Sequence, residues 1–472
     1  MTCNGAMDPH ATVAALWRAA GLPAEALGHL ELSGRDPVLP SSFRVGQAAQ
    51  ATIAATALAA AEVWARRGGR RQKVAVDLRH AAVEFRSERY LRLDGAPPRA
   101  LWDALSGAYR CGDGRWVRIH AVFPQHRDGV LRLLGCPGER AAVQGALWDW
   151  RAEDFETAAA EAGLVVAMLR GAEEWAAHRQ GLAVAALPLF SIEKVDEAPL
   201  RPLGEAERPL GGLRVLDLTR IIAGPVCGRA LAVHGAEVLR VTAGHLPSVA
   251  PLVVDTGRGK RSTELDLRNP AGRETLRALL AGADVFVQGY RPGALAKLGF
   301  APEAAAALRP GLVAVSLSAY GHAGPWAGRR GFDSLVQTAT GLNVLEAEGA
   351  GQDRPRPLPC QALDHASGYL MAFGAMAGLL RRAEQGGSWH VRVSLAQTGR
   401  WLQGLGRVQG GFEAPDPGPE EVADLLEESE SGFGKLTAVR HAAQLSETPA
   451  FWARPAMPLG SHPPAWSEAT DA

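Results

Sequence analysis

The residues with the clearest chemical potential are two neighbouring polar side chains at the start of an apolar run. Asp364 and His365 lie in "PCQALDHASGYLMAF", residues 359–373, which is otherwise mostly small and apolar. An ionised carboxylate is costly to desolvate, so its position needs an explanation. Asp is a favoured helix N-cap residue, and a partly desolvated carboxylate in a cleft is also a reactive group. The stretch by itself leaves both interpretations open.

A second carboxylate and a basic loop are further candidates. Asp333 lies in "RRGFDSLVQTATG", just before a helical pattern at 334–339, and is interpreted first as the N-cap of that helix. Arg258, Lys260 and Arg261 lie in "DTGRGKRSTELDL", which does not match the Walker A pattern. These three cations are either a solvated charge run or a grip for a phosphate.

Three loops that follow predicted strands could hold a phosphorylated ligand. The loop "TRIIAGPVCG" (219–228) opens a helix, but with only Gly224 and Gly228 it is no dinucleotide fingerprint, and a tight turn explains it as well. In "QGYRPGALAKLGF" (288–300), Tyr290 could stack on a base, and Arg291 or Lys297 could meet a phosphate. The third loop is "SLSAYGHAGPW" (316–326). The histidines show no metal-ligand spacing, and there is no Gly-x-Ser-x-Gly elbow.

The elements that must position these residues alternate between strand and helix. Strand patterns occur at 213–218, 237–241, 284–287 and 312–318, with helical patterns at 223–236 and 269–283 between them. This alternation predicts an α/β fold with a doubly wound, mostly parallel sheet. We assign this unit to residues 213–410.

The rest of the chain has a different pattern. Residues 1–200 combine a long Ala-rich helix (48–67) with a hairpin-like strand signal in "DGRWVRIHAVF" and several short helices, which indicates a smaller α+β domain placed before the sheet. The Pro- and Glu-rich stretch 201–212 is the predicted linker. Residues 411–472 are predicted to form an irregular C-terminal arm.

The same pattern of a long helix followed by a strand occurs in both units as an internal repeat. "ATIAATALAAAEVWARRGG" (51–69) and "YLMAFGAMAGLLRRAEQGG" (369–387) are both apolar helical stretches ending in Gly-Gly, and each is followed by a similar strand, at 73–78 and 390–395. In the ungapped alignment Gly46 faces Asp364. One copy therefore starts its helix without the carboxylate, which weakens capping as the sole explanation of Asp364.

Composition excludes several classes of protein. Lys and Arg together number 50, as do Asp and Glu, so no net charge favours binding to nucleic acid or to an anionic membrane. The five cysteines contain no CxxC pair, which suits a reducing cytoplasm. Neither a signal peptide in residues 1–17 nor a membrane span in 366–380 is expected. We expect a cytoplasmic protein.

The ordered motifs of residues 209–400 resemble class III (family III) CoA-transferases, a family that includes formyl-CoA transferase, carnitine CoA-transferase and α-methylacyl-CoA racemase. The resemblance rests on "PLGGLRVLDLTRIIAGPVCGRALAVHGAEVLRV", "GRGKRSTELDLRNPAGRETLRALLAGADVFVQGYRPGALAKLGF", "SLSAYGHAGPW", "GFDSLVQTATGL" and "LDHASGYLMAFGAMAGLLRR". Residues 1–200 resemble the second half of the family, out of order. The resemblance implies a Rossmann-like large domain and a homodimer.

The same resemblance implies a function and a set of site residues. Asp364 matches the family's nucleophile, which forms a mixed anhydride with the acyl group and then an aspartyl-CoA thioester. The implied substrates are an acyl-CoA and a small carboxylic acid, with coenzyme A bound as part of a substrate and no separate cofactor or metal. The implied CoA contacts are Arg220, Ile221, Ile222, Ala223, Lys260, Gly289, Tyr290, Arg291, Lys297, Ser318, Ala319 and Tyr320.

Two departures from the family bear on the substrate and the reaction. Ile222 stands where formyl-CoA transferase has a polar side chain, which argues against oxalate-like substrates. Phe332 precedes Asp333 where the racemase branch carries a His-Asp pair, so a base for abstracting the α-proton is missing. The alternatives are an acyl-CoA racemase or lyase on the same scaffold, or a non-catalytic CoA-binding relative.

Overall fold

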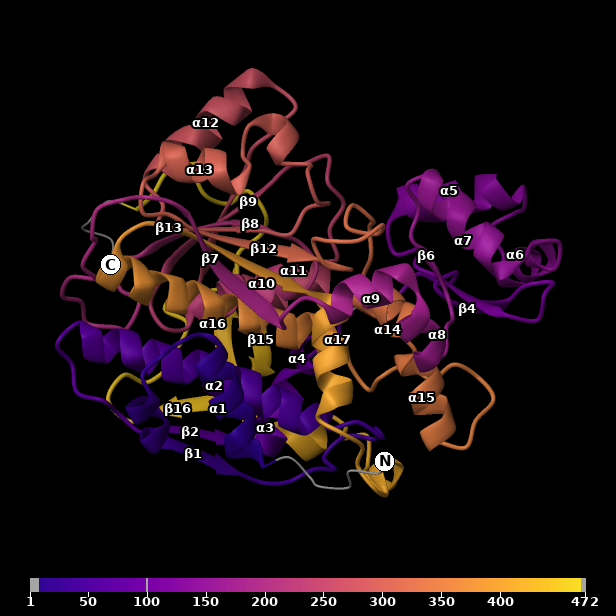
Figure 1. Cartoon of the computed structure of the whole chain (residues 1–472), viewed down its shortest axis with the longest axis horizontal. Coiled ribbons are helices and arrows are strands. Elements are labelled where there is room, and N and C mark those ends of the chain that lie inside the picture. The colour runs from indigo at the N-terminus through magenta and orange to yellow at the C-terminus, as the bar shows by residue number, and fades with distance from the viewer. Residues whose placement is uncertain (1–7, 99–100, 468–472) are drawn as a thin grey trace.

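A seven-stranded sheet runs through the centre of the protein (Figure 1). The computed structural model describes residues 8–98 and 101–467. Residues 1–7, which include Cys3 and the start of the stretch where no signal peptide is expected, lie outside the described residues. The strand order is β10-β9-β8-β11-β12-β13-β7, and every neighbouring pair is parallel except β13 and β7. The strands are β7 (Phe190–Asp196), β8 (Arg214–Leu218), β9 (Glu237–Thr242), β10 (Lys260–Glu264), β11 (Val285–Gln288), β12 (Val313–Ser318) and β13 (Ser388–Ser394).

Helices cover both faces of this sheet, which confirms the predicted doubly wound α/β class. Successive strand residues point to opposite faces. On β8, Val215 packs in the cluster that contains α10 (Ala223–Ala232) and α16 (Ala362–Gln385). The next residue, Leu216, packs in the cluster of α12 (Pro270–Ala281) and α13 (Pro302–Leu308). Burial of both faces explains why the central strands β11 and β12 each begin with three consecutive apolar residues, 285–287 and 313–315.

The small residues of α16 allow it to lie close to its neighbours. A Cβ added at Gly368 would come within 2.5 Å of the carbonyl oxygen of Ala223 on α10. Added at Gly374 or Gly378, it would meet valine side chains of β13 and β12 at 2.5 and 2.8 Å. The glycines therefore fix α16, and with it Asp364, against the end of α10 and the centre of the sheet.

The internal repeat is present as a second helix–strand–helix unit. It consists of α2 (Val45–Arg66), β2 (Val74–Asp77) and α3 (Leu78–Glu84), which correspond to α16, β13 and α17 (Leu395–Gly404). The two long helices pack together, and the hydroxyl of Thr56 donates a hydrogen bond to the carbonyl of Tyr369 at 2.9 Å. On the far side of α2, β2 joins β1 (Leu30–Ser33) and β16 (Ala443–Leu445) in a small sheet (Figure 1).

A smaller α+β unit projects from one side of the molecule (Figure 1). Its antiparallel sheet, β4-β5-β6, confirms the predicted hairpin, and Tyr109 and Phe155 are part of a separate hydrophobic core. After this unit the chain returns through α8 (Ala172–Ala177) and α9 (Arg179–Ala185) to β7, which therefore adds to the large sheet before residues 201–212. Its elements are β4 (Gly107–Arg110), β5 (Trp116–Ile119), α5 (Pro124–Leu134), α6 (Arg140–Leu147), α7 (Ala152–Glu161) and β6 (Val166–Met168).

The C-terminal segment differs from the expected irregular arm. β14 (Leu426–Ser431) and β15 (Gly434–Val439) form a hairpin, and β15 also pairs with β3 (Arg92–Leu93). β16 then pairs with β2 of the first repeat copy. Exposed acidic residues of β14 hide the strand pattern, whereas Leu436 and Ala438 alternate into a buried cluster. The arm therefore stabilises the N-terminal half of the chain.

The remaining elements are shorter. In residues 8–98 and 101–467, no helix combines the length and the apolar character needed to cross a membrane. The other helices are α1 (Pro9–Ala19), α4 (Ser87–Tyr90), α11 (Ala250–Gly257), α14 (Asp333–Ala339) and α15 (Leu342–Gly349). The 3₁₀ turns are Ala24–His29, Ala296–Leu298, Gly411–Glu413 and Glu420–Leu425.

Candidate active site

Asp364 does not cap the helix it begins. It is the third residue of α16, and the side chain of the N-cap residue, Gln361, makes no capping hydrogen bond. Asp333 takes that role instead, because its Oδ2 accepts hydrogen bonds from the backbone N–H groups of Leu363 at 2.8 Å and Asp364 at 3.0 Å. The N-cap interpretation of Asp364 is therefore wrong, and so is the expectation that Asp333 caps its own helix, whose N-cap residue is Phe332.

The carboxyl group of Asp364 is left without an internal partner. No described residue donates a hydrogen bond to it, and the residue is 6% exposed. Burial, and then the nearby carboxylates of Asp333 and Glu88, raise its pKa well above the ordinary value. A helix N-terminus by itself favours the ionised form of a nearby carboxyl group. The surrounding burial and negative charge outweigh that contribution.

Asp333 caps α16 and places a second titratable carboxyl group next to Asp364. Burial raises its pKa to about 6, even though hydrogen bonds from the Asp364 N–H, the Gln337 amide and the Leu363 N–H act to lower it. Two carboxyl groups this close cannot both ionise cheaply. The pair therefore tends to share one negative charge at neutral pH.

His365, next to Asp364 in the sequence, makes a buried contact with the N-terminal half of the chain. Its Nε2 lies 3.2 Å from Oε2 of Glu88 on α4, and its ring stacks on Phe85 with centroids 5.3 Å apart. Both His365 and Glu88 are almost fully buried. His365 thus ties α16 to the N-terminal half of the chain.

Asp364 lies in the wall of a mostly apolar pocket, which we call the acyl pocket because the family resemblance implies an acyl substrate. The space between its lining atoms, open solvent included, is about 460 Å³. The large sheet domain and the small α+β unit both contribute to it. The lining residues are Leu101, Trp102, His120, Val122, Ile221, Ile222, Val249, Leu252, Phe332, Asp333, Ser334, Gln361 and Asp364.

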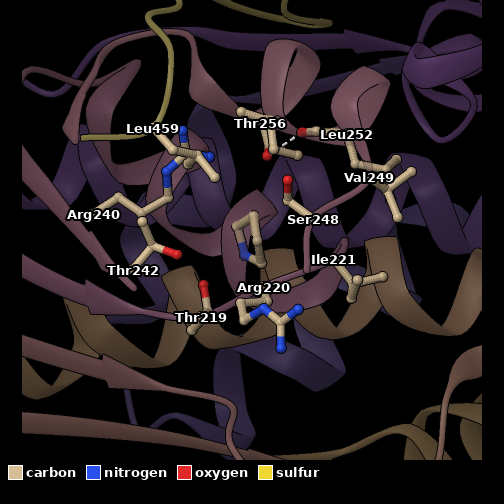
Figure 2. A pocket seen from close by; sticks show the side chains of 12 residues that line it. Thr219, Arg220, Ile221, Arg240, Thr242, Ser248, Val249, Leu252, Thr256 and Leu459 are labelled. Atoms are coloured by element: carbon tan, nitrogen blue, oxygen red, sulfur yellow. Dashed lines mark hydrogen bonds between the residues drawn. The ribbon is translucent and has the colours of Figure 1, made fainter. Parts of the chain in front are cut away.

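A second pocket adjoins the first, and we call it the polar pocket because two arginines and four hydroxyl-bearing residues are among its twelve lining residues (Figure 2). The space between its lining atoms, open solvent included, is about 380 Å³. Arg240 and Thr242 come from β9, Thr256 comes from α11, and Thr219 and Arg220 follow β8. Arg240 is 4% exposed, and its Nε has no hydrogen-bond partner among the described residues. The other lining residues are Ile221, Pro225, Ser248, Val249, Leu252, Val253 and Leu459.

The two pockets share Ile221, Val249 and Leu252, and Ile221 has a strained backbone. Its φ is 75°, a left-handed conformation that is unfavourable for a β-branched residue. Such strain persists only where the surrounding structure enforces it, and it concentrates at ligand sites. The β8–α10 loop is therefore held in a specific shape between the two pockets.

The predicted CoA-contacting loops are brought to one edge of the sheet. β8, β11 and β12 are neighbouring parallel strands, so the loops at 219–223, 289–291 and 318–320 all leave from their carboxyl ends. Arg220, Ile221 and Ile222 line the pockets directly, with Ala223 buried behind them at the start of α10.

The more distant members of this predicted set lie outside both pockets. Tyr290 is half-buried, and the charge of Arg220 acts on it, while Gly289, Arg291 and Lys297 are exposed on the same edge. Ser318 is half-buried and Ala319 is 8% exposed.

Lys260 and Tyr320 are not available for a ligand. The ammonium of Lys260 is buried and donates hydrogen bonds to Asp217 at 2.8 Å and to the carbonyl of Pro225 at 2.7 Å. Lys260 begins β10 and so lies at the amino edge of the sheet, opposite the loops. Tyr320 is 1% exposed and packs edge-on against Trp326. The structure therefore contradicts the expectation that Lys260 and Tyr320 contact CoA.

The other cations of the basic loop are also internal. Arg258 pairs with Asp255 at 3.1 Å, and Arg261 pairs with Glu237 at 3.1 Å. Both are buried. Neither a solvated charge run nor a phosphate grip describes this segment, because burial of its backbone in β10 draws the charges into ion pairs within the protein.

Several lining residues were not found by sequence reasoning. Trp102, His120 and Val122 belong to the small α+β unit, more than two hundred residues before Asp364 in the chain. His120 follows a strand with ordinary alternation and has no local motif. Arg240 lies within an apolar strand, where a buried cation could have indicated a pocket.

The chain is similar to known CoA-transferases. The family model described as CoA-transferase family III matches residues 18–202 and 210–425. An acyl-CoA transferase of Gibberella moniliformis is 31% identical over 366 residues, which cover 68% of this chain and 64% of that protein. The succinyl-CoA:glutarate CoA-transferase of Mus musculus is 35% identical over 210 residues, covering 41% and 48%.

A solved structure gives a similar partial match. The crystal structure of Rv3272 from Mycobacterium tuberculosis is 34% identical, with 42% of this chain and 58% of that chain covered and a TM-score of 0.39. The chain spans less than two thirds of the length of each of these relatives. The family model, however, covers most of the chain in two stretches and confirms the resemblance deduced from the motifs. The chain therefore belongs to CoA-transferase family III.

Proposed function

We propose that the protein transfers CoA from an acyl-CoA to a carboxylic acid, with Asp364 as the nucleophile. The observation that carries the proposal is a carboxyl group without a hydrogen-bond donor in the wall of a pocket, while a second carboxylate caps its helix. A capping role would have occupied the side chain of Asp364. Its pocket and its lack of partners suit a group that forms bonds to a substrate.

The proposed reaction has two exchanges of acyl groups. A carboxylate oxygen of Asp364 attacks the thioester carbonyl carbon, the C–S bond breaks, and the thiolate leaves with the electron pair. The thiolate then attacks the aspartyl carbonyl of the mixed anhydride, which releases the donor acid as a carboxylate and leaves an aspartyl-CoA thioester. The acceptor carboxylate repeats these steps in reverse order and leaves as its CoA ester. Each step exchanges activated acyl groups of similar energy, so the sequence is reversible.

The polar pocket supports binding of the CoA portion beside the acyl pocket. Arg220 and Arg240 supply positive charge, and the hydroxyl-bearing residues Thr219, Thr242, Ser248 and Thr256 supply hydrogen-bonding groups. Phosphate and pantetheine groups need cations and hydroxyl groups, which this pocket combines with six apolar residues, whereas no Lys or Arg is among the described residues that line the acyl pocket. The strained Ile221 between the pockets suits the position of the thioester.

Trapping of the covalent intermediate tests the proposal. The protein is incubated with a panel of acyl-CoA esters, treated with hydroxylamine or borohydride, digested, and analysed by mass spectrometry. We expect a hydroxamate or the reduced alcohol at Asp364, and neither product in Asp364→Asn. Absence of any adduct across the panel, together with unchanged CoA binding in Asp364→Asn, would favour a non-catalytic CoA-binding relative. The cytoplasmic location and the homodimer stay predictions.

A further inference from the structure

The small α+β unit supplies one wall of the acyl pocket, and that wall is rigid. His120 directly follows β5 and stacks on Phe332 with ring centroids 4.0 Å apart and an angle of 6° between the planes. Trp102 contacts the same imidazole edge-on at 5.6 Å. The backbone N–H of His120 donates to the carbonyl of Val165 at 3.1 Å. These contacts hold the imidazole in one orientation in the pocket wall.

The cation Arg118 contacts the pocket wall, with its guanidinium carbon 6.0 Å from the centroid of the Trp102 ring, but it does not line the pocket. Burial, and then His126 and Arg118, lower the pKa of His120 to about 3, so its ring is neutral near pH 7. Among the described residues that line the pocket there is no Lys or Arg. Its ionisable acids are Asp333 and Asp364. A second carboxylate on a bound acyl group would therefore meet negative charge and an apolar wall, which is unfavourable.

Two buried polar atoms in the wall have no protein partner. Nδ1 of His120 and Oγ of Ser334 make no hydrogen bond with any described residue, and their residues are 5% and 4% exposed. Buried polar groups are nearly always satisfied, so such exceptions indicate a missing ligand or water. Both residues line the same pocket as Asp364.

We infer that the acyl pocket selects an uncharged, largely apolar acyl group, and that His120 and Ser334 hydrogen-bond one uncharged oxygen of that group. The inference rests on the proposed function and adds the substrate class. The apolar part of the acyl group lies against Trp102, Phe332 and the aliphatic side chains of the wall. The oxygen is either the thioester carbonyl oxygen or a hydroxyl on the acyl chain, since a neutral imidazole and a serine bind both.

Binding measurements test the substrate class without relying on turnover. The affinities of butyryl-CoA, phenylacetyl-CoA, 3-hydroxybutyryl-CoA, succinyl-CoA and glutaryl-CoA are measured by calorimetry on the Asp364→Asn protein. We expect the first three esters to bind at least about tenfold more tightly than the two dicarboxylic esters, about 1.4 kcal/mol. Equal or tighter binding of succinyl-CoA would overturn the inference. The trapping of Asp364 in the wild-type protein is independent of this result, so failure of the proposed function and failure of the inference are distinguishable.

Substitutions of His120 and Ser334 test whether these two residues bind an oxygen of the acyl group. In His120→Phe and Ser334→Ala, we expect at least about fivefold weaker binding of the preferred esters. An equal loss for butyryl-CoA and 3-hydroxybutyryl-CoA assigns the oxygen to the thioester carbonyl, and a loss for the hydroxyacyl ester alone assigns it to the hydroxyl. The control is His178→Phe, because His178 also stacks on a neighbouring aromatic ring, that of Trp175, but is not among the residues that line the pocket.

Two outcomes would contradict the role of the pair. Unchanged affinity for all esters in the folded Ser334→Ala and His120→Phe proteins, checked by thermal unfolding, shows that the pair binds no ligand oxygen. Exchange of the α-proton of butyryl-CoA in D₂O by the wild-type protein, lost in His120→Phe, would instead make His120 an acid–base group of a racemase or lyase.

Discussion

The reactivity of Asp364 depends on which neighbouring group holds the helix end. Asp333 satisfies the backbone N–H groups of Leu363 and Asp364, and so the carboxyl group of Asp364 is free to meet a substrate. The same neighbour, with Glu88 and burial, favours the protonated acid. A poorly solvated carboxylate is more reactive once it forms, so under the proposed function these surroundings lower the ionised fraction of Asp364 and strengthen it as a nucleophile.

The first prediction concerns pH. The pKa of Asp364 is raised in the folded protein, so the ionised nucleophile forms only as the pH rises above the usual carboxylate range. We expect the rate of trapping with butyryl-CoA to increase with pH, with its acid limb above that of an exposed aspartate. Rapid-quench trapping between pH 5 and pH 9 measures it. A rate that is already maximal at pH 5 would contradict the raised pKa.

The raised pKa also has a consequence for stability. A carboxyl group whose folded pKa exceeds its unfolded pKa stabilises the fold while it is protonated, and this contribution is lost as the pH rises. Asp364→Asn removes the buried charge, so we expect it to increase the free energy of unfolding at pH 8 by about 1 kcal/mol. The gain should shrink toward pH 4. Denaturant unfolding of both proteins at the two pH values gives the comparison.

The next prediction concerns Arg220. Its guanidinium lies over the ring of Phe123 at 5.0 Å and donates to the carbonyl of Pro247 at the edge of the polar pocket. If it binds a phosphate or pantetheine oxygen, Arg220→Gln should raise the KM for acyl-CoA about tenfold. Arg268→Gln is the control, because Arg268 is exposed and pairs with Asp266 at 2.7 Å outside both pockets. Equal KM values in the two variants would exclude Arg220 from CoA binding.

At the scale of elements, the two repeat copies start their long helices in related ways. Asp36 accepts a hydrogen bond from the backbone N–H of Gln47 at 2.9 Å at the start of α2, as Asp333 does at the start of α16. Each helix is thus capped by a carboxylate from outside the helix. Only the second copy places a further carboxylate, Asp364, beside its cap.

These two caps provide a matched pair of variants. Asp333→Ala and Asp36→Ala should each lower the free energy of unfolding by about 1 to 2 kcal/mol, because each leaves backbone N–H groups unsatisfied. Only Asp333→Ala should also change the rate and pH dependence of trapping at Asp364. Chemical denaturation and the trapping assay measure the two effects. An equal change of trapping in Asp36→Ala would mean that the first copy contributes to the reaction.

Sequence reasoning succeeded where an element is buried on both faces. Strands such as β8 and β12 are mostly apolar, and their parallel arrangement follows from the alternation with helices. It failed for β14, whose exposed face is acidic, and for Lys260, whose charge suggested a ligand although Asp217 neutralises it internally. His120 could not be assigned, because its role depends on packing against Phe332 across more than two hundred residues.

At the scale of the whole molecule, only the second repeat copy places a carboxylate, Asp364, in a pocket wall. The corresponding position in the first copy is closely surrounded by other side chains. Gly46 occupies the position of Asp364 in the first copy, and a Cβ there would lie 2.3 Å from Oδ1 of Asp36 and 2.7 Å from Leu78. No side chain fits without displacing the cap. The first copy therefore supports the second through α2 and the Thr56 contact to α16.

This asymmetry predicts the stoichiometry. We expect one trapped acyl group per chain at saturation, measured by intact-protein mass spectrometry. Gly46→Asp should create no second modified residue and should destabilise the protein by about 2 kcal/mol or more, because it overpacks the start of α2. A second adduct in that variant would show that the first copy retains a usable site.

The separate hydrophobic core of the small α+β unit has a consequence for how the protein could diversify. The unit holds itself together, yet it carries Trp102 and His120 to the wall opposite the nucleophile. Under the proposed function, the small α+β unit thus contributes only part of the wall that selects the acyl group, while Asp364, Asp333 and the rest of that wall belong to the sheet domain. Exchanging this unit for that of a relative should change which acid is handled and leave the reactive aspartate, its cap and its helix untouched.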